Sequence, residues 1–285
     1  MVVKADGLAA GKGVYVCSTR EEAERAVREV AVDRLFGEAG ERIVLEECLQ
    51  GEEASILALV DGEHVAMLAS SQDHKRVFNG DEGPNTGGMG AYSPAPVIGD
   101  DLWPVIREEV FGRTLAELKR RGITYRGVLY AGLMITADGP RVLEFNCRFG
   151  DPETQVILPR LDVDLVPLLE ACIDGTLDEG RICWRPEPCV CVVMASGGYP
   201  GKYEKGKVVT GLNDVRSLRD VVVFHAGTTL ADGNVLTSGG RVLGVTALGP
   251  DLRQAVRNAY EAVCKLRFDQ AQYRSDIAAK ALTRS

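Results

Sequence analysis

The sequence predicts a globular protein of mixed α/β (α+β) class, and three observations lead to this prediction. Hydrophobic residues make up 45% and charged residues 26% of the 285 positions, which is the balance of a folded chain. Short apolar runs bounded by glycine, proline and aspartate are typical of strands. Longer stretches with apolar residues on one face are typical of helices. The length leaves room for one large domain or two ordinary ones.

Composition argues against several classes of protein. Lys and Arg number 33 against 41 Asp and Glu, and this net charge of −8 argues against a nucleic-acid partner. No apolar run reaches the roughly 18 residues of a membrane span, and the N-terminus lacks a signal-peptide pattern. Eight scattered cysteines without a CxxC pair, and only three histidines, argue against a disulfide framework or a zinc site. We therefore expect reduced, buried thiols in a cytoplasmic protein.

The first seventy residues predict a β-rich region with one helix. A glycine-rich loop over residues 6–13 separates the first two strands. The helix is expected to begin at a capping box of Ser18 and Glu21, and Asp61-Gly62 is a hairpin signal between the last two strands. The predicted strands cover residues 2–4, 14–17, 43–49, 55–60 and 64–69.

The remaining sequence predicts a long loop, three helices and further strands. Residues 70–100 show no period and many Gly, Asp and Asn residues, which is typical of a functional loop. Pro186 and Pro188 indicate a linker and a boundary near residue 186, after which a second unit of short strands begins. The predicted helices cover residues 101–121, 161–173 and 252–266, and a hairpin covers residues 128–135 and 141–146.

The first glycine loop is a candidate phosphate-binding segment. Gly7, Gly11, Lys12 and Gly13 run into a strand, so the segment fits neither a P-loop nor a dinucleotide fingerprint, both of which open a helix. Lys4 precedes the loop, which is the reverse of the order in protein kinases. Glycines let backbone N–H groups approach phosphate oxygens, and a lysine adds positive charge. An ordinary hairpin with a surface lysine fits this segment equally well.

A sharper candidate lies in the strand that ends at Asn146. Glu144 and Asn146 alternate with Leu143 and Phe145, so their side chains are expected on one face of the strand. Carboxylate and carboxamide oxygens suit Mg²⁺, which binds few protein oxygens together with substrate phosphates. Arg148 lies just beyond the pair. The alternative is a solvated strand end.

Acidic residues at 46, 47, 52 and 53 surround a further strand and turn, and a solvated acidic turn explains this segment more simply than a binding site does. Together and in this order, however, the lysine strand, the glycine loop, the acidic strand and Glu-Phe-Asn resemble the ATP-grasp superfamily. The segments QDHKRVFNGDEGPNTGGMGAYSPAP (72–96), VVKADGLAAGKGV and LEFNCRFGDPETQ resemble the phosphoribosylamine–glycine ligase (glycinamide ribonucleotide synthetase) family. Three later segments, VVMASGGYPGKY, FHAGTTL and TSGGRVLGVTALG, resemble the C-terminal domain of that family.

The resemblance implies an ATP-grasp fold followed by a small mixed β/α C-terminal domain. The ATP-grasp domain is expected over residues 1–186, with a lid subdomain over about 1–68 and a larger subdomain over about 69–186. The C-terminal domain is expected over 187–285. The implied reaction joins glycine to 5-phosphoribosylamine, with hydrolysis of ATP to ADP and phosphate, through a glycyl phosphate in de novo purine biosynthesis.

The resemblance also implies roles for particular residues. Glu144 and Asn146 are expected to bind Mg²⁺ or Mn²⁺, and Arg148 is the expected catalytic residue. The expected ATP-binding residues are Lys4, Gly7, Gly11, Lys12, Gly13, Glu46, Glu47, Leu49 and Glu53. The expected substrate-binding residues are Asp73, His74, Lys75, Asn85, Thr86, Gly87, Arg148, Asp151 and Glu153.

One departure from the family pattern concerns the N-terminal domain, whose glycine-rich loop is associated with the phosphoribosylamine site and is not found in this sequence. An incomplete gene, a fragment, or a split protein with a separate partner would each fit. Two other functions stay open. One is another ATP-grasp carboxylate–amine ligase, such as a carboxylase or peptide ligase. The other is a non-catalytic ATP-binding fragment or subunit that needs a separate N-terminal domain.

Overall fold

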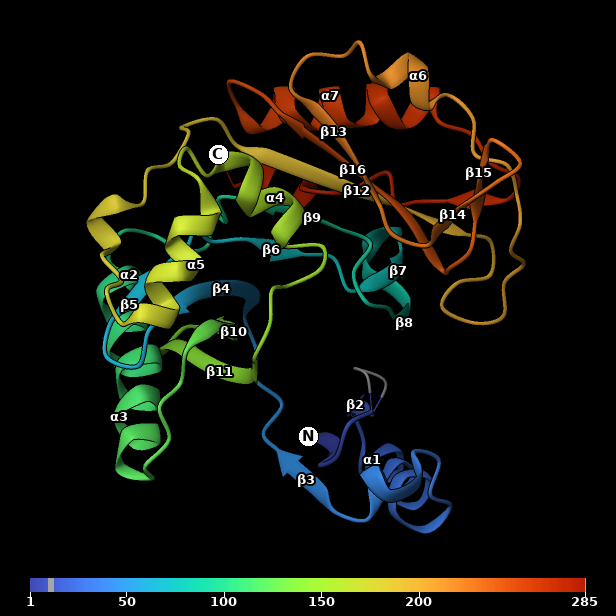
Figure 1. Ribbon diagram of the computed structural model, residues 1–285. Coiled ribbons are helices and arrows are strands. Elements are labelled where there is room, and N and C mark those ends of the chain that lie inside the picture. Colours follow the sequence, from blue (N-terminus) through green and yellow to red (C-terminus); the bar gives the residue numbers. More distant parts are fainter. Residues whose placement is uncertain (10–12, 285) are drawn as a thin grey trace. The chain divides into compact units, whose positions relative to one another are not determined.

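The computed structural model describes residues 1–9 and 13–284 and divides into two compact units, Met1–Gly51 and Glu52–Ser285 (Figure 1). The division falls at residue 51, whereas the sequence placed the end of a lid subdomain at about residue 68. The strand that begins at Glu52 pairs with strands of the second unit. Among the described residues, no helix is long and apolar enough to cross a membrane.

The first unit is a three-stranded antiparallel sheet with one helix. The strands β1 (Val2–Ala5), β2 (Val14–Val16) and β3 (Ile43–Glu46) lie in the order β2-β1-β3. Helix α1 (Arg20–Val27) continues into a π-helical turn (Arg28–Val32), and a short 3₁₀ turn covers Gly37–Gly40. A small core of four buried residues joins helix and sheet, namely Val3, Cys17, Ala23 and Ala26.

The capping box of α1 lies one residue later than predicted. Thr19 has extended backbone angles, and its hydroxyl accepts a hydrogen bond from the N–H of Glu22 at 3.2 Å. The Glu22 carboxylate in turn accepts from the N–H of Thr19. The prediction of Ser18 and Glu21 was wrong because Thr19, and not Ser18, is the last extended residue before the helix.

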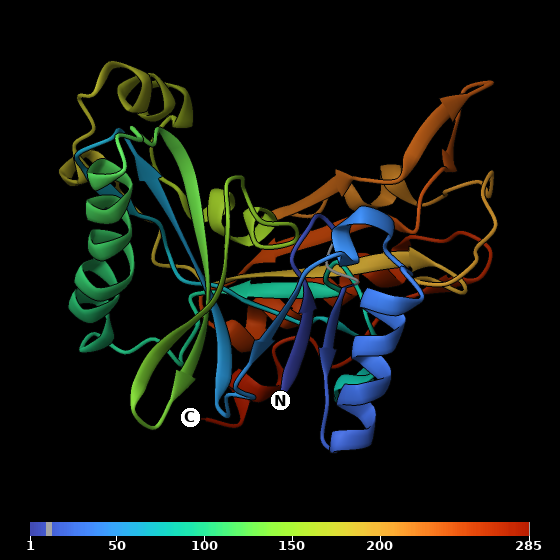
Figure 2. The same cartoon turned by 90° about the horizontal axis from the view of Figure 1, so that it is seen from below.

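The second unit contains a four-stranded sheet whose order is β11-β10-β4-β5. Its strands are β4 (Glu52–Val60), β5 (Val65–Met67), β10 (Gly127–Thr136) and β11 (Gly139–Asn146). One face packs against the long helical stretch α2 (Leu102–Val105), Ile106–Gly112 and α3 (Arg113–Arg120), as Figures 1 and 2 show. The buried side chains of that contact include Ile56 and Leu133 from the sheet and Phe111 from the helix.

A six-stranded sheet forms the other layer of the second unit. Its path is β13-β16-β12-β9-β6, and β17 also pairs with β12. Strands β6 (Gln72–Asp73) and β9 (Gly90–Ser93) precede the expected boundary near residue 186. Strands β12 (Cys189–Ser196), β13 (Val221–His225), β16 (Arg241–Leu248) and β17 (Ala271–Gln272) follow it. One hydrogen-bonded sheet therefore runs across that boundary.

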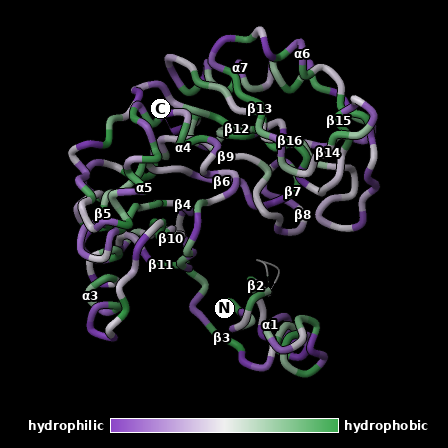
Figure 3. Tube along the Cα trace, viewed as in Figure 1, coloured by the Kyte–Doolittle hydropathy of each residue, from purple (hydrophilic) through white to green (hydrophobic). Residues whose placement is uncertain are grey.

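Helix α7 (Leu252–Lys265) covers the six-stranded sheet, and β12 is coloured hydrophobic along most of its length in Figure 3. Two hairpins stand apart from the main sheets, β7 (Arg76–Phe78) with β8 (Glu82–Asn85) and β14 (Thr228–Ala231) with β15 (Asn234–Thr237). The remaining helices are α4 (Thr154–Ile157), α5 (Leu165–Asp174), α6 (Leu212–Val215) and α8 (Ala279–Leu282), with 3₁₀ turns at Asn79–Asp81, Leu158–Arg160 and Glu179–Arg181.

Two further expectations about local structure were wrong. The segment 70–100 contains four short strands, because its polar residues alternate with buried ones such as Val77, Met89 and Tyr92. The expectation of buried thiols holds for only half of the cysteines. The described residues include all eight, each a free thiol, and Cys48, Cys147, Cys183 and Cys264 are exposed.

Candidate functional site

The candidate site of the second unit lies on one face of the four-stranded sheet. Ser55 of β4 is opposite Gly132 of β10, and Gly132 is opposite Glu144 of β11. Two residues along, Tyr130 is opposite Asn146. Because directly paired residues point to the same face of a sheet, these side chains share the face opposite the long helix. Gly132 leaves room for its neighbour, since an added Cβ would lie 3.4 Å from Cγ of Glu144.

Glu144 and Asn146 lie side by side, as the alternation of β11 predicted. The Nδ2 of Asn146 donates to Oε1 of Glu144 at 3.2 Å, and Nη2 of Arg148 lies 3.5 Å from Oδ1 of Asn146. Residues 1–9 and 13–284 contain no group of three or more His, Cys, Asp or Glu side chains arranged to hold a metal ion. The Glu144 and Asn146 oxygens still suit a Mg²⁺ or Mn²⁺ ion that takes its other ligands from phosphates and water.

A lysine among carboxylates lies next to this pair. The Nζ of Lys75 binds the carboxylate of Glu53. Burial lowers the pKa of Lys75, but the charges of Asp73 and Glu53, with a further contribution from Glu144, outweigh burial and raise this pKa above its usual value. Lys75 is therefore a permanent cation at neutral pH, placed beside the residues expected to bind metal.

Unlike Lys75, Asp73 does not keep a fixed charge at neutral pH. Burial raises its pKa to about 7; the charge of Lys75 counteracts that rise, and the charges of Glu153 and Glu53 add to it. The carboxyl group of Asp73 can therefore gain or lose a proton near neutral pH, which a carboxyl with an ordinary pKa of about 4 does not do.

Glu153 is buried beneath this cluster, with 4% of its surface exposed. Its Oε1 accepts hydrogen bonds from the hydroxyls of Ser55 at 3.1 Å and Tyr130 at 3.0 Å. Burial and the charge of Glu153 raise the pKa of Tyr130, so the phenol stays protonated and remains a donor. The carboxylate is thus held in one orientation by two donors from neighbouring strands.

The structure does not bring His74 into this cluster. The His74 ring is buried, and its Nε2 accepts a hydrogen bond from the N–H of Ala278 at 3.0 Å. Burial lowers the pKa of His74, which agrees with a neutral ring whose Nε2 is an acceptor. His74 therefore connects the loop to the C-terminal segment, although the sequence grouped it with Asp73 and Lys75.

The other predicted substrate residues lie on two neighbouring loops. Asn85 is exposed at the end of β8, opposite Arg76. Thr86 donates to the Lys75 carbonyl from both its N–H (2.7 Å) and its hydroxyl (2.8 Å). The guanidinium of Arg241 contacts both Gly87 and Asp151.

In the first unit, the lysine and the acidic strand predicted to bind ATP are neighbours. Lys4 Nζ lies 2.5 Å from Oε2 of Glu46. The backbone carbonyl of Gly13 accepts from the N–H of Ala5 at 2.8 Å, and a Cβ on Gly7 would lie 2.5 Å from Cα of Ala39. Strand β3 ends at Glu46, so Glu47 and Leu49 lie outside regular structure. Gly11 and Lys12 lie outside the described residues.

Sequence reasoning missed Ser55, Tyr130, Tyr199 and Arg241. The first two are polar groups within apolar strand runs, and a buried hydroxyl that needs a partner is the signal that points to them. Tyr199 and Arg241 contact residues that are far away in the sequence, so no local pattern points to them.

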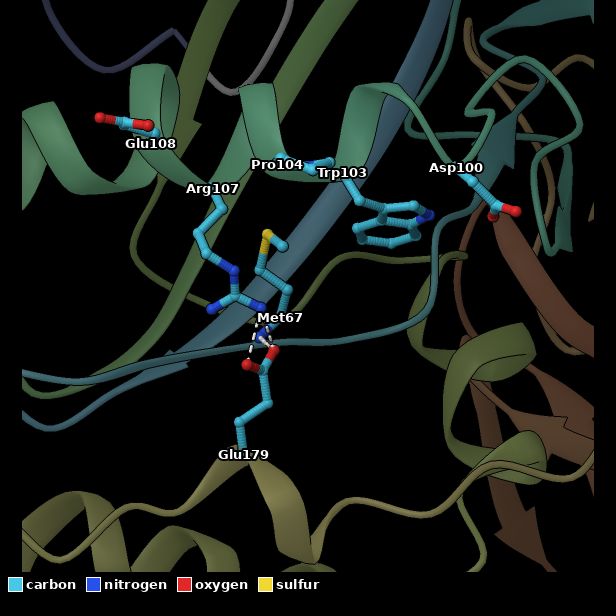
Figure 4. A pocket seen from close by; sticks show the side chains of 7 residues that line it. All are labelled: Met67, Asp100, Trp103, Pro104, Arg107, Glu108 and Glu179. Carbon is cyan, nitrogen blue, oxygen red and sulfur yellow. Dashed lines mark hydrogen bonds and ion pairs between the residues drawn. The ribbon is translucent and has the colours of Figure 1, made fainter.

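A cavity of about 540 Å³ in the second unit is lined by none of the predicted site residues (Figure 4). Met67, Trp103 and Asp100 are among its lining residues. Its principal charges satisfy one another, since Arg107 donates to both carboxylate oxygens of Glu179 at 2.5 and 2.6 Å. The chemistry of the predicted site therefore lies elsewhere.

Comparison with known proteins first defines the class. The family model for the phosphoribosylglycinamide synthetase ATP-grasp (A) domain matches residues 1–154, and the model for the C domain of the same family matches residues 189–280. The fold is an ATP-grasp fold followed by a C-terminal domain of mixed strands and helices, as the sequence predicted. The chain belongs to the phosphoribosylglycinamide synthetase family.

Relatives of known name agree with this assignment. The chain is 53% identical to a phosphoribosylamine–glycine ligase of Pseudomonas aeruginosa, over 100% of this chain and 66% of the relative. It is 54% identical to the trifunctional purine biosynthetic protein adenosine-3 of Gallus gallus, over 99% of this chain and 28% of the relative. The crystal structure of a Thermotoga maritima phosphoribosylamine–glycine ligase matches with a TM-score of 0.88 and 38% identity, over 97% of this chain and 68% of that one. The chain thus spans about two thirds of the bacterial relatives.

Proposed function

We propose that this chain carries the ATP-dependent chemistry of a cytoplasmic phosphoribosylamine–glycine ligase. The reaction joins glycine to 5-phosphoribosylamine and yields glycinamide ribonucleotide, ADP and phosphate, in de novo purine biosynthesis. The observation that carries the proposal is the sheet face on which Glu144 and Asn146 lie beside Arg148, with Lys75 bound among carboxylates next to them. Family membership supports the choice of substrates.

Two sets of residues are proposed to act on ATP. Lys4 and the glycine loop, of which Gly7 and Gly13 are described, would neutralise and cover its phosphates. Glu144 and Asn146 would hold Mg²⁺ or Mn²⁺, which supplies positive charge to the phosphates when bound.

The remaining residues act on the substrates. Glycine carboxylate attacks the γ-phosphoryl group to form glycyl phosphate and ADP, and the amine of phosphoribosylamine then displaces phosphate. Arg148 would stabilise negative charge on the transferring phosphoryl or on the glycine carboxylate. Lys75, as a permanent cation, would attract the same carboxylate. Asp73, with a pKa of about 7, is suited to take the proton that the attacking amine loses.

One observation keeps a second function in view. The chain covers 66% of its P. aeruginosa relative, so a fragment that binds ATP but needs a further segment for ligation also fits. Another ATP-grasp carboxylate–amine ligase fits the fold, but the matches at over 50% identity all favour the purine enzyme.

The test measures nucleotide binding and turnover separately. Calorimetry on this chain should show Mg²⁺-dependent ATP binding. ADP release should be assayed with glycine and phosphoribosylamine, for the chain alone and after addition of the part of the P. aeruginosa relative that the chain does not cover. ATP binding with ligation that appears or rises upon that addition supports the proposal. Absence of ATP binding, or ADP release that depends on neither substrate in either arm, would refute it.

A further inference from the structure

The backbone of Gly87 is held from both sides by residues of the C-terminal region. Arg241, the first residue of β16, donates from Nη1 to the Gly87 carbonyl at 2.6 Å. The N–H of Gly87 donates to the hydroxyl of Tyr199 at 3.1 Å. Both residues lie within the range matched by the C-domain model, whereas Gly87 lies in the loop that carries the predicted substrate residues. Two of the hydrogen bonds that fix this loop thus come from the C-terminal region.

The same guanidinium holds a second loop of the site. Arg241 donates from Nη1 to the Asp151 carbonyl at 2.8 Å and from Nη2 to Oδ2 of Asp151 at 2.9 Å. The two loops touch directly, since Gly88 has a φ of +111° and a Cβ there would lie 2.3 Å from Cδ of Pro152. A Cβ on Gly87 would lie 2.9 Å from Cζ of Arg241. The positive φ and the close approach of the Pro152 ring therefore require glycine at position 88.

Arg241 and Tyr199 together clamp the backbone of Gly87, and a continuous set of hydrogen bonds connects this clamp with Lys75. The N–H of Gly88 donates to the hydroxyl of Thr86 at 2.9 Å, and Thr86 donates twice to the Lys75 carbonyl. The side chain of Lys75 then binds Glu53. Displacing Gly87 would therefore displace the backbone of Lys75 and its ammonium group.

We propose that Arg241 and Tyr199 are positioning residues for the site that binds the carboxylate substrate. They act by clamping Gly87, and with it Thr86 and Lys75, against the loop of Asp151. This inference rests on the proposed function for the identity of the substrate, here glycine, but the clamp itself can be tested without turnover.

The experiment compares Arg241→Gln, Tyr199→Phe and Arg241→Lys with the unchanged chain. Arg257→Gln is the matched control, because Arg257 is an exposed arginine of α7 that bonds only to its own helix neighbour Gln254 in the described contacts. Hydrogen exchange of residues 84–90 reports the clamp. Calorimetry with glycine, in the presence of Mg²⁺ and a non-hydrolysable ATP analogue, reports the substrate site, and calorimetry with the analogue alone reports the nucleotide site.

Arg241→Gln should speed exchange in residues 84–90 and weaken glycine binding by about tenfold or more, the loss expected for hydrogen bonds to a charged donor. Affinity for the ATP analogue should stay within about twofold, because neither Arg241 nor Tyr199 bonds directly to a residue assigned to ATP. Tyr199→Phe should give a smaller change in the same direction, and Arg241→Lys should recover part of the loss. The control should match the unchanged chain.

Unchanged exchange in residues 84–90 for both Arg241→Gln and Tyr199→Phe would overturn the inference. Equal losses of glycine and nucleotide affinity would also overturn it, because they indicate general destabilisation. If Arg241→Gln does not fold, Tyr199→Phe decides, since it removes a single hydroxyl. If the unchanged chain binds no glycine, the assignment of a glycine site to this chain alone fails, and the exchange data alone still decide whether the clamp exists.

Discussion

At neutral pH, Asp73 should lower the free energy of unfolding of the protein, and Asp73→Asn should restore it. Burial raises its pKa from 3.8 to about 7. Between these two pH values the unfolded chain has released the proton and the folded chain retains it. Stability therefore falls as the pH rises from about 4 to about 7, and the full loss is present above 7. Asp73→Asn lacks the titrating group and should not show this loss.

The size of the effect follows from the shift. A rise of about 3 pKa units corresponds to a ceiling of roughly 4 kcal/mol. Asp73 is only half-buried, so solvent screens part of the effect and we expect about 2 kcal/mol.

Urea unfolding at pH 5 and pH 8 measures this difference. Trp103 and Trp184 are the two tryptophans of the chain and both lie in the second unit, so their fluorescence follows the unit that contains Asp73. Asp138→Asn, at an exposed turn between β10 and β11, is the control. From pH 5 to pH 8, the unchanged chain should lose more free energy of unfolding than Asp73→Asn does. It should lose the same amount as Asp138→Asn. Parallel pH dependence of Asp73→Asn and the unchanged chain, within about 0.5 kcal/mol, would contradict the reasoning.

Three further outcomes are expected. Changing Glu144 and Asn146 together to Ala should abolish most of the Mg²⁺ dependence of ATP affinity, measured by calorimetry, and should leave the circular dichroism spectrum unchanged. Glu261→Ala on α7 is the control, and undiminished Mg²⁺ dependence in the double variant would exclude these residues as ligands. Gly13→Val should lower ATP affinity and the stability of the first unit by about 1–3 kcal/mol, because a Cβ at position 13 would lie 2.7 Å from the Cβ of Ala9. Affinity and stability equal to those of the unchanged chain would argue against a tight loop. Arg274→Ala should lower the free energy of unfolding of the second unit, measured by urea denaturation, by about 3–5 kcal/mol, because the guanidinium is 1% exposed and binds Asp81 and Asp276. A loss below about 1 kcal/mol would show that these ion pairs contribute little.

The local parts of the site could be predicted from sequence because their determinants are local. The alternation of Glu144 and Asn146 with Leu143 and Phe145 places the first pair on one strand face, and the structure shows the two side chains in contact. The hairpin of β10 and β11 follows from two apolar runs and the turn at Asp138-Gly139.

Other parts depend on contacts that no local pattern encodes. His74 lies between two residues of the cluster in sequence, yet its ring binds the backbone of Ala278, 204 positions away. Arg241 reaches Gly87 across 154 positions. The pKa of Asp73 depends on burial and on Lys75, Glu153 and Glu53 together, so the sequence could nominate Asp73 for the site but could not assign its protonation.

The six-stranded sheet explains why the C-terminal region is part of the scaffold of the site. The loop with Lys75, Thr86 and Gly87 leaves the sheet at β6 and returns to it at β9. Strand β9 is paired on one side with β6 and on the other with β12, so residues 189–196 fix the position of one end of the loop. Arg241, on the strand next to β12, holds the loop at Gly87, shortly before β9 begins. A sheet is stiff along its hydrogen-bonded direction, and a shift of β12 would move both anchors of the loop together. The charge of Lys75 is therefore positioned by strands that lie more than a hundred residues further along the chain, and a boundary near residue 186 divides the sequence without dividing this part of the fold.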